Sequence, residues 1–288
     1  MATQVKNLIL IPTDFSETCG NAISHGVKLA HFLNGRVCIL HVINQETKAA
    51  LKKKKVGVDY IETRLKAYKN YYEKKYNLPV AGLAREGSIF STINEVAGEI
   101  KASLMMLGTH GKKGLQHVFG SYAFRIVLES PVPTIVVQKR TFREGYKNIV
   151  FPISNDLEPR QKVQWATKLA RLFDTKLHLF LAREKDKGLK SRLEIITRQI
   201  TKVLDNENIK YSVQTAEATG NFARQVLSHA VTIQSELIMI MTMPQVDLPE
   251  FSISAWDERL MFNESQIPVM CINPTRLGNF FYEWSTWW

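Results

Sequence analysis

The chain has 288 residues, of which 45% are hydrophobic and 23% charged, and it carries a formal net charge of +11 at pH 7. The length predicts two domains or one large one, and the composition is that of a globular protein rather than a disordered one. No apolar run approaches the ~18 residues of a membrane-spanning helix, and the first residues lack a signal-peptide pattern. The three cysteines show no paired spacing, which argues against a disulfide framework or structural zinc. We therefore expect a cytoplasmic protein without a membrane span.

The positive charge is concentrated in the first half of the chain. Residues 1–140 hold 20 Lys and Arg against 10 Asp and Glu, whereas residues 141–288 hold 18 against 17. The first half is therefore the half suited to an anionic ligand. Its densest basic run, Lys52–Lys55, is typical of a solvated helix face. Nucleic-acid binding is the alternative, but no recognition motif or aromatic platform accompanies the run, so we expect no specific nucleic-acid partner.

Strand and helix patterns alternate along the first half. The predicted strands cover residues 5–11, 36–42, 79–85, 104–107 and 134–137, and the predicted helices begin near residues 16, 49, 88 and 120. The polar pattern from Ala49 to Tyr76 predicts one long helix. This alternation predicts a mostly parallel sheet with helices on both faces. Right-handed crossovers make a doubly wound sheet the natural architecture.

The second half repeats the first. The matching segments are residues 6–9 with 147–150, 28–30 with 168–170, 102–109 with 235–242, and 130–137 with 265–272. Four matches in one order indicate a tandem duplication. We predict an N-terminal domain at residues 1–140, a C-terminal domain at residues 141–274 and an aromatic tail at residues 275–288. Each domain is expected to be a doubly wound, five-stranded sheet.

The main binding motif lies between Leu104 and Val137. A buried apolar run leads into Gly108-Thr109-His110-Gly111, then a loop with two lysines, then Gly120-Ser121 at a predicted helix start. Glycine lets a backbone approach a ligand closely, and the free N–H groups of a helix start favour an anion. The stretch therefore predicts a phosphate-binding loop, although its spacing is neither the Walker nor the dinucleotide pattern.

This arrangement resembles the universal stress protein family. Nucleotide-binding members of that family carry glycine, two residues, glycine, nine residues, and then glycine followed by serine or threonine. Here, eight residues separate Gly111 from Gly120. The resemblance covers nearly the whole chain and implies a Rossmann-like fold of the adenine nucleotide alpha hydrolase-like type. It also implies ATP or a related adenine nucleotide as ligand, used as a sensor or switch in a stress response.

The binding motif is degenerate in the second half. Met241-Thr242-Met243-Pro244 stands where the first half has Gly108–Gly111, and Pro152-Ile153-Ser154 stands where it has Pro12-Thr13-Asp14. The nucleotide is therefore expected in the N-terminal domain only, with the C-terminal domain supporting the fold.

The resemblance places the ligand contacts on this sequence. Asp14 follows the first strand and would reach a sugar hydroxyl; if Mg²⁺ accompanies the phosphates, Asp14 is the carboxylate near it. Val42 ends the neighbouring strand and would meet the adenine. Read from the residues alone, Asp14 equally fits a helix cap with Ser16, and Val42 fits plain strand core. The expected contacts are Pro12, Thr13, Asp14, Val42, Leu107, Gly108, His110, Gly111, Gly120, Ser121 and Tyr122.

Three functions stay open at this point. The first is a nucleotide-binding module, the second is an interaction protein whose shorter loop no longer fits phosphates, and the third is a weak ATPase in which His110 or Asp14 positions water. No nucleophile or paired carboxylate accompanies His110, so we expect no enzyme. The resemblance further implies an internal pseudo-dimer paired through residues 134–138 and 269–273, and it leaves open a homodimer of whole chains.

Overall fold

The computed structural model describes residues 7–109, 117–155, 159–242 and 255–274. The chain divides into two compact units. One consists of Met1–Gly145 with Glu258–Met270, and the other of Tyr146–Asp257 with Cys271–Trp288. The boundary between residues 140 and 141 stays a prediction. Among the helices in the described ranges, none is both long enough and apolar enough to cross a membrane.

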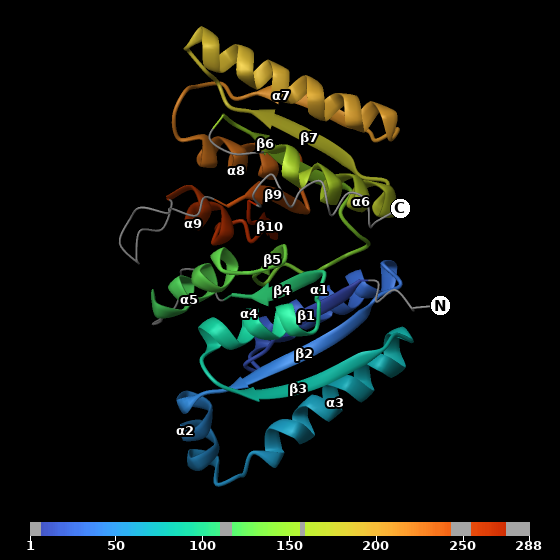
Figure 1. Cartoon of the computed structure of the whole chain (residues 1–288), viewed down its shortest axis with the longest axis vertical. Coiled ribbons are helices and arrows are strands. Elements are labelled where there is room, and N and C mark those ends of the chain that lie inside the picture. Colours follow the sequence, from blue (N-terminus) through green and yellow to red (C-terminus); the bar gives the residue numbers. More distant parts are fainter. Residues whose placement is uncertain (1–6, 110–116, 156–158, 243–254, 275–288) are drawn as a thin grey trace. The chain divides into compact units, whose positions relative to one another are not determined.

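The first half of the chain builds a sheet with the strand order β3-β2-β1-β4-β5. The strands are β1 (Leu8–Pro12), β2 (Arg36–Ile43), β3 (Val80–Glu86), β4 (Leu104–Gly108) and β5 (Thr134–Val137). Their pairings are parallel. The chain first moves outward from β1 to β3 and then returns to β4 on the other side of β1 (Figure 1). The sheet is therefore doubly wound, as the sequence predicts, and its direction reverses between β1 and β4.

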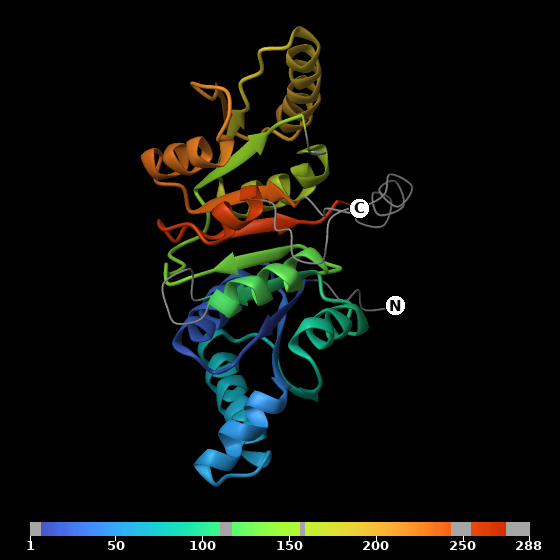
Figure 2. The ribbon, with the colours of Figure 1, turned by 90° about the vertical axis from the view of Figure 1, so that its left-hand side faces the viewer.

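The helices of this half cover the sheet. They are α1 (Glu17–Phe32), α2 (Gln45–Lys54), α3 (Asp59–Tyr76), α4 (Ile89–Glu99) and α5 (His117–Leu128). Helix α1 packs on β1 and β4, α3 packs on β3, and α4 packs against α5. In Figure 2, α1 and α4 lie on opposite sides of the strands. The central residues Ile9, Leu10 and Ile11 are fully buried, as expected of parallel strands covered on both faces.

The long helix predicted from Ala49 to Tyr76 is wrong, because the structure has two helices there. Helix α2 ends at Lys54, and α3 begins at Asp59. Lys55 has a φ of 56°, and its N–H bonds to the carbonyl of Lys52 while the N–H of Val56 bonds to that of Leu51. These two bonds and the left-handed residue form a Schellman helix end. The sequence hides this end because lysine occupies the position that glycine usually takes.

The second half builds the same kind of sheet, in the order β10-β9-β6-β7-β8. Its strands are β6 (Asn148–Ile153), β7 (Lys176–Leu181), β8 (Tyr211–Thr215), β9 (Leu237–Met241) and β10 (Val269–Ile272). Its helices are the 3₁₀ helix η1 (Pro159–Lys162), α6 (Val163–Phe173), α7 (Lys187–Asn206), α8 (Phe222–Thr232) and α9 (Ala255–Met261). Strand β6 pairs in parallel with β7 and β9. The predicted fold class, two tandem doubly wound parallel sheets with helices, is confirmed.

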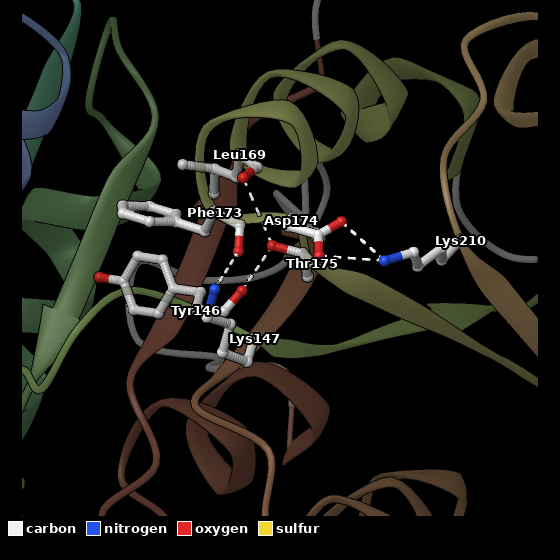
Figure 3. Close-up of polar contacts among 7 residues, drawn as sticks. All are labelled: Tyr146, Lys147, Leu169, Phe173, Asp174, Thr175 and Lys210. Carbon is white, nitrogen blue, oxygen red and sulfur yellow. Dashed lines mark hydrogen bonds and ion pairs between the residues drawn. The ribbon is translucent and has the colours of Figure 1, made fainter.

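Equivalent hydrogen bonds show which residues of the two halves correspond around β1 and β6, the first strand of each half. The side chain of Asn7 donates to the carbonyl of Leu33 at 2.8 Å, and Lys147 Nζ donates to that of Phe173 at the same distance (Figure 3). Lys147 therefore corresponds to Asn7 and not to Lys6, one residue away from the sequence match. The offset is 140 residues in this part of the repeat.

The turn before β7 supports the same offset. Asp174 has a φ of 51°, and its counterpart Asn34 has a φ of 49°. Figure 3 shows that the carboxylate of Asp174 pairs with Lys210 at 2.9 Å and that the hydroxyl of Thr175 donates to the carbonyl of Tyr146 at 2.5 Å. These side-chain bonds anchor the start of β7, so the two halves share this turn while using different side chains to hold it.

Candidate functional site

A cavity of about 320 Å³ lies at the carboxyl ends of β1, β2 and β4. Its wall also includes residues of α1, α2, α3, α4 and α5, so every helix of the first half contributes to it. The cavity therefore lies at the position where the sheet reverses direction, which is where open α/β sheets bind ligands. Its volume falls at the lower end of the range of small-molecule pockets, roughly 300–1,000 Å³.

Six of the predicted contact residues line this cavity together. They are Pro12, Thr13, Asp14, Val42, Leu107 and Gly108. Of the other five, His110 and Gly111 lie outside the described residues. Gly120, Ser121 and Tyr122 belong to α5, where the structure describes the backbone but not these side chains. The part of the prediction that rests on β1, β2 and β4 therefore gathers around one cavity.

The helix start predicted at Gly120-Ser121 is displaced. Helix α5 begins at His117, so Gly120 is its fourth residue and Ser121 its fifth. The orphan N–H groups of a helix belong to its first turn. Gly120 therefore lies at the edge of the anion-binding end of α5, and Ser121 lies beyond it.

Gly108 has a packing role that the sequence does not reveal. From the sequence, Gly108 is interpreted as a residue that lets the backbone approach a ligand. In the structure it is the last residue of β4 and has no left-handed backbone angle. A Cβ atom at this position would lie 3.0 Å from the carbonyl oxygen of Thr18, 3.1 Å from Cα of Cys19 and 3.2 Å from Cβ of Ala22. Glycine is therefore needed because α1 packs directly against the end of β4.

Asp14 lies in a tight turn between β1 and α1. Its Oδ1 accepts a hydrogen bond from the N–H of Ser16 at 2.7 Å, and Ser16 Oγ in turn caps α1 by accepting from the N–H of Cys19. Thr13 Oγ1 accepts from the N–H of Phe15 at 3.0 Å. The capping reading of Asp14 is thus correct. The same residue also lines the cavity, so capping and ligand contact are compatible here.

Phe15 holds an unusual backbone conformation at the cavity wall. Its φ is 65°, a region that bulky residues rarely occupy and that often marks functional sites. The ring stacks on the imidazole of His41 with centroids 4.6 Å apart, and Arg64 Cζ lies 4.2 Å from the ring centre. All three residues line the cavity. Sequence reasoning misses this group, because its members come from a loop, a strand and a helix with no shared motif.

His41 is held as a neutral side chain. Its Nδ1 lies 2.7 Å from the carbonyl oxygen of Thr13, so Nδ1–H donates there, and Nε2 is 3.3 Å from the hydroxyl of Thr47. Burial lowers the pKa of His41 below its ordinary value, although the Thr13 carbonyl opposes this shift. Burial and the nearby Asp14 carboxylate likewise raise the pKa of the Cys19 thiol to about 12. Neither side chain is charged at neutral pH.

Thr109 lies on the cavity wall and has a buried hydroxyl. The residue is 5% exposed and lines the cavity directly after Gly108. Its backbone N–H bonds to the carbonyl of Val137 at 2.9 Å. Its hydroxyl has no hydrogen-bond partner within the described part of the chain. A buried hydroxyl without a partner costs free energy, so a ligand with a polar group is the natural complement at this point.

The second half differs at the equivalent positions. The N–H of Ser103 bonds to Leu8 and the N–H of Glu236 bonds to Asn148, which sets an offset of 133 residues for β4 and β9. Gly108 then corresponds to Met241, and Thr109 corresponds to Thr242. Unlike Thr109, Thr242 has a partner for its hydroxyl, which donates to Asn273 Oδ1 at 2.5 Å.

Lys162 fills the end of the C-terminal sheet. It corresponds to Ala22 by the offset of 140 residues, and it is 1% exposed. Its Nζ donates to the carbonyl of Pro152 at 2.5 Å and to that of Met239 at 2.9 Å, and it lies 4.1 Å from the ring centre of Phe151. Burial lowers the pKa of Lys162 well below its ordinary value. The amine thus lies between β6, near its carboxyl end, and the middle of β9.

Comparison with known proteins agrees with this arrangement. The model of the Universal stress protein family matches residues 7–138. Over these residues the N-terminal domain is similar to the universal stress protein family. Universal stress protein MJ0531 of Methanocaldococcus jannaschii is 27% identical over 139 residues, which cover 46% of this chain and 81% of that protein.

Solved structures extend the likeness in fold to both halves. A universal stress protein from Archaeoglobus fulgidus superposes with a TM-score of 0.74 at 14% identity, covering 93% of this chain and 98% of that one. A putative universal stress protein from Pseudomonas aeruginosa gives a TM-score of 0.65 at 13% identity, covering 98% of both chains. At this identity the likeness concerns the fold alone. It agrees with two sheets of the universal stress protein type in one chain.

Proposed function

We propose that the N-terminal domain of this protein binds ATP or a related adenine nucleotide. The observation that carries the proposal is the cavity at the reversal point of the sheet, with Asp14, Gly108 and Thr109 on its wall. The buried hydroxyl of Thr109 has no hydrogen-bond partner among the described residues. The family resemblance supplies the ligand class. The excess of positive charge in residues 1–140 supports an anionic ligand.

The proposed roles follow the position of each residue on the cavity wall. Val42 contacts the adenine, Asp14 accepts from a ribose hydroxyl, and the segment from Gly108 to Gly120 contacts the phosphates. Thr109 donates its hydroxyl to the ligand and so removes the cost of its unpaired state. One oxygen of Asp14 already accepts from Ser16. If Mg²⁺ accompanies the phosphates, Asp14 is the carboxylate that meets its hydration shell.

We further propose a binding role rather than a catalytic one. Two side chains on the wall that could act as base or nucleophile are not poised for it: His41 has both ring nitrogens engaged, and burial keeps the Cys19 thiol protonated. In this account the protein is a nucleotide-dependent sensor or switch in a stress response. The C-terminal domain pairs with the N-terminal one as an internal pseudo-dimer. Three free cysteines, all buried, fit a reducing cytoplasm.

The test is thermal unfolding of the full chain with and without millimolar ATP and Mg²⁺. A ligand at about 100 times its dissociation constant stabilises the folded state by about 2.7 kcal/mol, which raises Tm by a few degrees. We expect this rise in the parent protein and a much smaller one in Thr109→Val. The matched control is Thr242→Val, which should keep the full rise because it alters the second half.

Two outcomes would contradict the proposal. No rise with any adenine nucleotide would favour the interaction protein. A rise in Tm that Thr109→Val retains and Thr242→Val loses would place the ligand in the second half of the chain.

A parallel assay for phosphate release tests the absence of catalysis, and turnover that disappears in Asp14→Ala would establish the weak ATPase instead.

A further inference from the structure

The helix pair α2–α3 carries more than half of the excess positive charge of the chain. Residues 45–79 hold 10 Lys and Arg against 4 Asp and Glu, a net of +6 out of +11. The seven residues from Lys52 to Val58 are all exposed. They join the end of α2 to the start of α3, and we call them the basic tip. Figure 2 shows α2 extending beyond the strands of its sheet. The charge therefore stands on a projecting end of the N-terminal unit.

Helix stability accounts for part of this charge, because Lys52, Lys53 and Lys54 lie in the last turn of α2, where basic side chains interact favourably with the helix dipole. This interaction still leaves the three side chains exposed to solvent. The basic tip also lacks carboxylate partners in the described part of the chain: the ion pair of α2 joins Lys48 to Glu86, outside the tip. Lys54 Nζ lies 5.6 Å from the ring centre of Tyr60. The tip thus presents cationic groups that no acidic side chain neutralises.

Apolar side chains accompany this charge. Val56 is 37% exposed and Val58 is 42% exposed, with Gly57 between them. The Schellman bonds at Lys55 and Val56 fix the turn that presents them. Lysines attract anionic headgroups, while exposed apolar side chains gain by entering the boundary between headgroups and acyl chains. The tip combines both kinds of group within seven residues.

We propose that the basic tip docks on an anionic phospholipid surface. A single-stranded nucleic acid is also polyanionic, but such ligands need several exposed rings on which bases stack. Among the tyrosines of α3, Tyr71 alone is largely exposed, and its hydroxyl accepts from Lys75 at 2.9 Å. The exposed apolar groups of the tip are aliphatic, which suits a lipid interface better than a base. The proposal stands independently of the nucleotide site.

The test is co-sedimentation of the full chain with vesicles of phosphatidylcholine alone and with vesicles that also contain phosphatidylserine. We expect binding to the anionic vesicles only, and its loss at high salt. The variant Lys52→Gln/Lys53→Gln/Lys55→Gln leaves the cavity residue Lys54 in place. It should lower the partition coefficient by on the order of 100-fold, since each lysine near the surface contributes a factor of roughly 5. Val56→Ser/Val58→Ser should lower it less.

The matched control is Lys185→Gln/Lys187→Gln/Lys190→Gln, which removes the same charge from exposed positions in the second half. It should change binding by less than about 3-fold, because these lysines lie outside the proposed contact. Absence of binding to anionic vesicles, or an equal loss in the control, would overturn the proposal. Tighter binding of a single-stranded oligonucleotide that the tip variant abolishes would also overturn it and assign the surface to nucleic acid.

Discussion

The two halves of this chain share one strand order but differ at the carboxyl ends of their central strands. In the first half, a cavity is lined by Asp14, Gly108 and Thr109, and the small residue Ala22 packs against Gly108. In the second half, Lys162 and Met241 stand at the positions that correspond to Ala22 and Gly108, and both are buried. The comparison teaches that the sheet and the ligand site are separable. The strands and their pairing survive duplication, while the side chains at the strand ends differ between the two halves.

The hydroxyls of Thr109 and Thr242 show the same difference on a smaller scale. Both residues donate their backbone N–H to the neighbouring last strand, to Val137 and Ile272 respectively. Thr242 also has a side-chain partner in Asn273, whereas Thr109 has none within the described residues. Within the described residues, the fold therefore supplies a side-chain partner to one threonine and not to the other. Substitutions at these paired positions therefore test whether the two halves differ in this way.

The largest effect is expected at Lys162. Lys162→Ala removes a buried side chain and two hydrogen bonds, and it should lower the free energy of unfolding by about 2–5 kcal/mol, as for other large-to-small changes in a core. Lys162→Met keeps most of the volume and should cost clearly less. Equilibrium denaturation of the full chain measures both. If the alanine variant is as stable as the parent, Lys162 does not fill the C-terminal sheet end as described.

Gly108→Ala should destabilise the first half by about 1–3 kcal/mol, because the added Cβ overpacks the contact between α1 and β4. The control is Gly98→Ala, where the added Cβ meets nothing within 4 Å. That change should be neutral or stabilising by up to about 1 kcal/mol, since alanine favours helix more than glycine does. Denaturant unfolding of the two variants side by side checks the prediction. Equal stabilities would show that Gly108 serves the loop and not the packing.

Lys162 should also make stability depend on pH. The unfolded chain keeps a proton on this lysine up to its ordinary pKa of 10.5, whereas the folded chain gives it up at a much lower pH. Between the two values the unfolded state binds more protons, so stability rises with pH, by about 1.4 kcal/mol per pH unit from this group. Lys162→Met removes that contribution. The free energies of unfolding of the parent and of Lys162→Met, measured from neutral to alkaline pH, should therefore converge or cross. If the two run parallel, Lys162 does not lose its proton on folding.

The smallest effect separates the two threonines without ligand. Thr242→Val should cost about 1 kcal/mol because a buried hydrogen bond is lost. Thr109→Val should cost less than about 0.5 kcal/mol because its hydroxyl has no partner to lose. Melting of both variants in the absence of nucleotide gives the comparison. A larger loss for Thr109→Val than for Thr242→Val would mean that the hydroxyl of Thr109 is already satisfied.

The sequence predicts those residues of the site that lie at the ends of predicted strands. Pro12–Asp14, Val42 and Gly108 each end a predicted strand, and the ends of parallel strands meet at one edge of a sheet. The duplication predicts the second sheet in the same way. Asp14 lies between the end of β1 and the start of α1. This position lets it bond to the N–H of Ser16 and also line the cavity.

The sequence fails where a contact depends on packing between distant elements. Phe15, His41 and Arg64 form one group in space but carry no common pattern in sequence. The break after Lys54 is hidden because Lys55 adopts a conformation that glycine usually signals. The role of Lys162 is hidden as well, since a lysine at a helix start normally predicts a solvated side chain.

The most direct test of the central claim is hydrogen exchange of the full chain with and without ATP and Mg²⁺, followed by peptide. We expect slower exchange in segments 8–19 and 104–109, which carry the ends of β1 and β4 and the start of α1. The counterparts 148–154 and 237–242 should exchange at the same rate in both conditions. Protection confined to the first half would support one nucleotide site beside a filled counterpart. Protection of the second half, or no protection in either, would contradict the account.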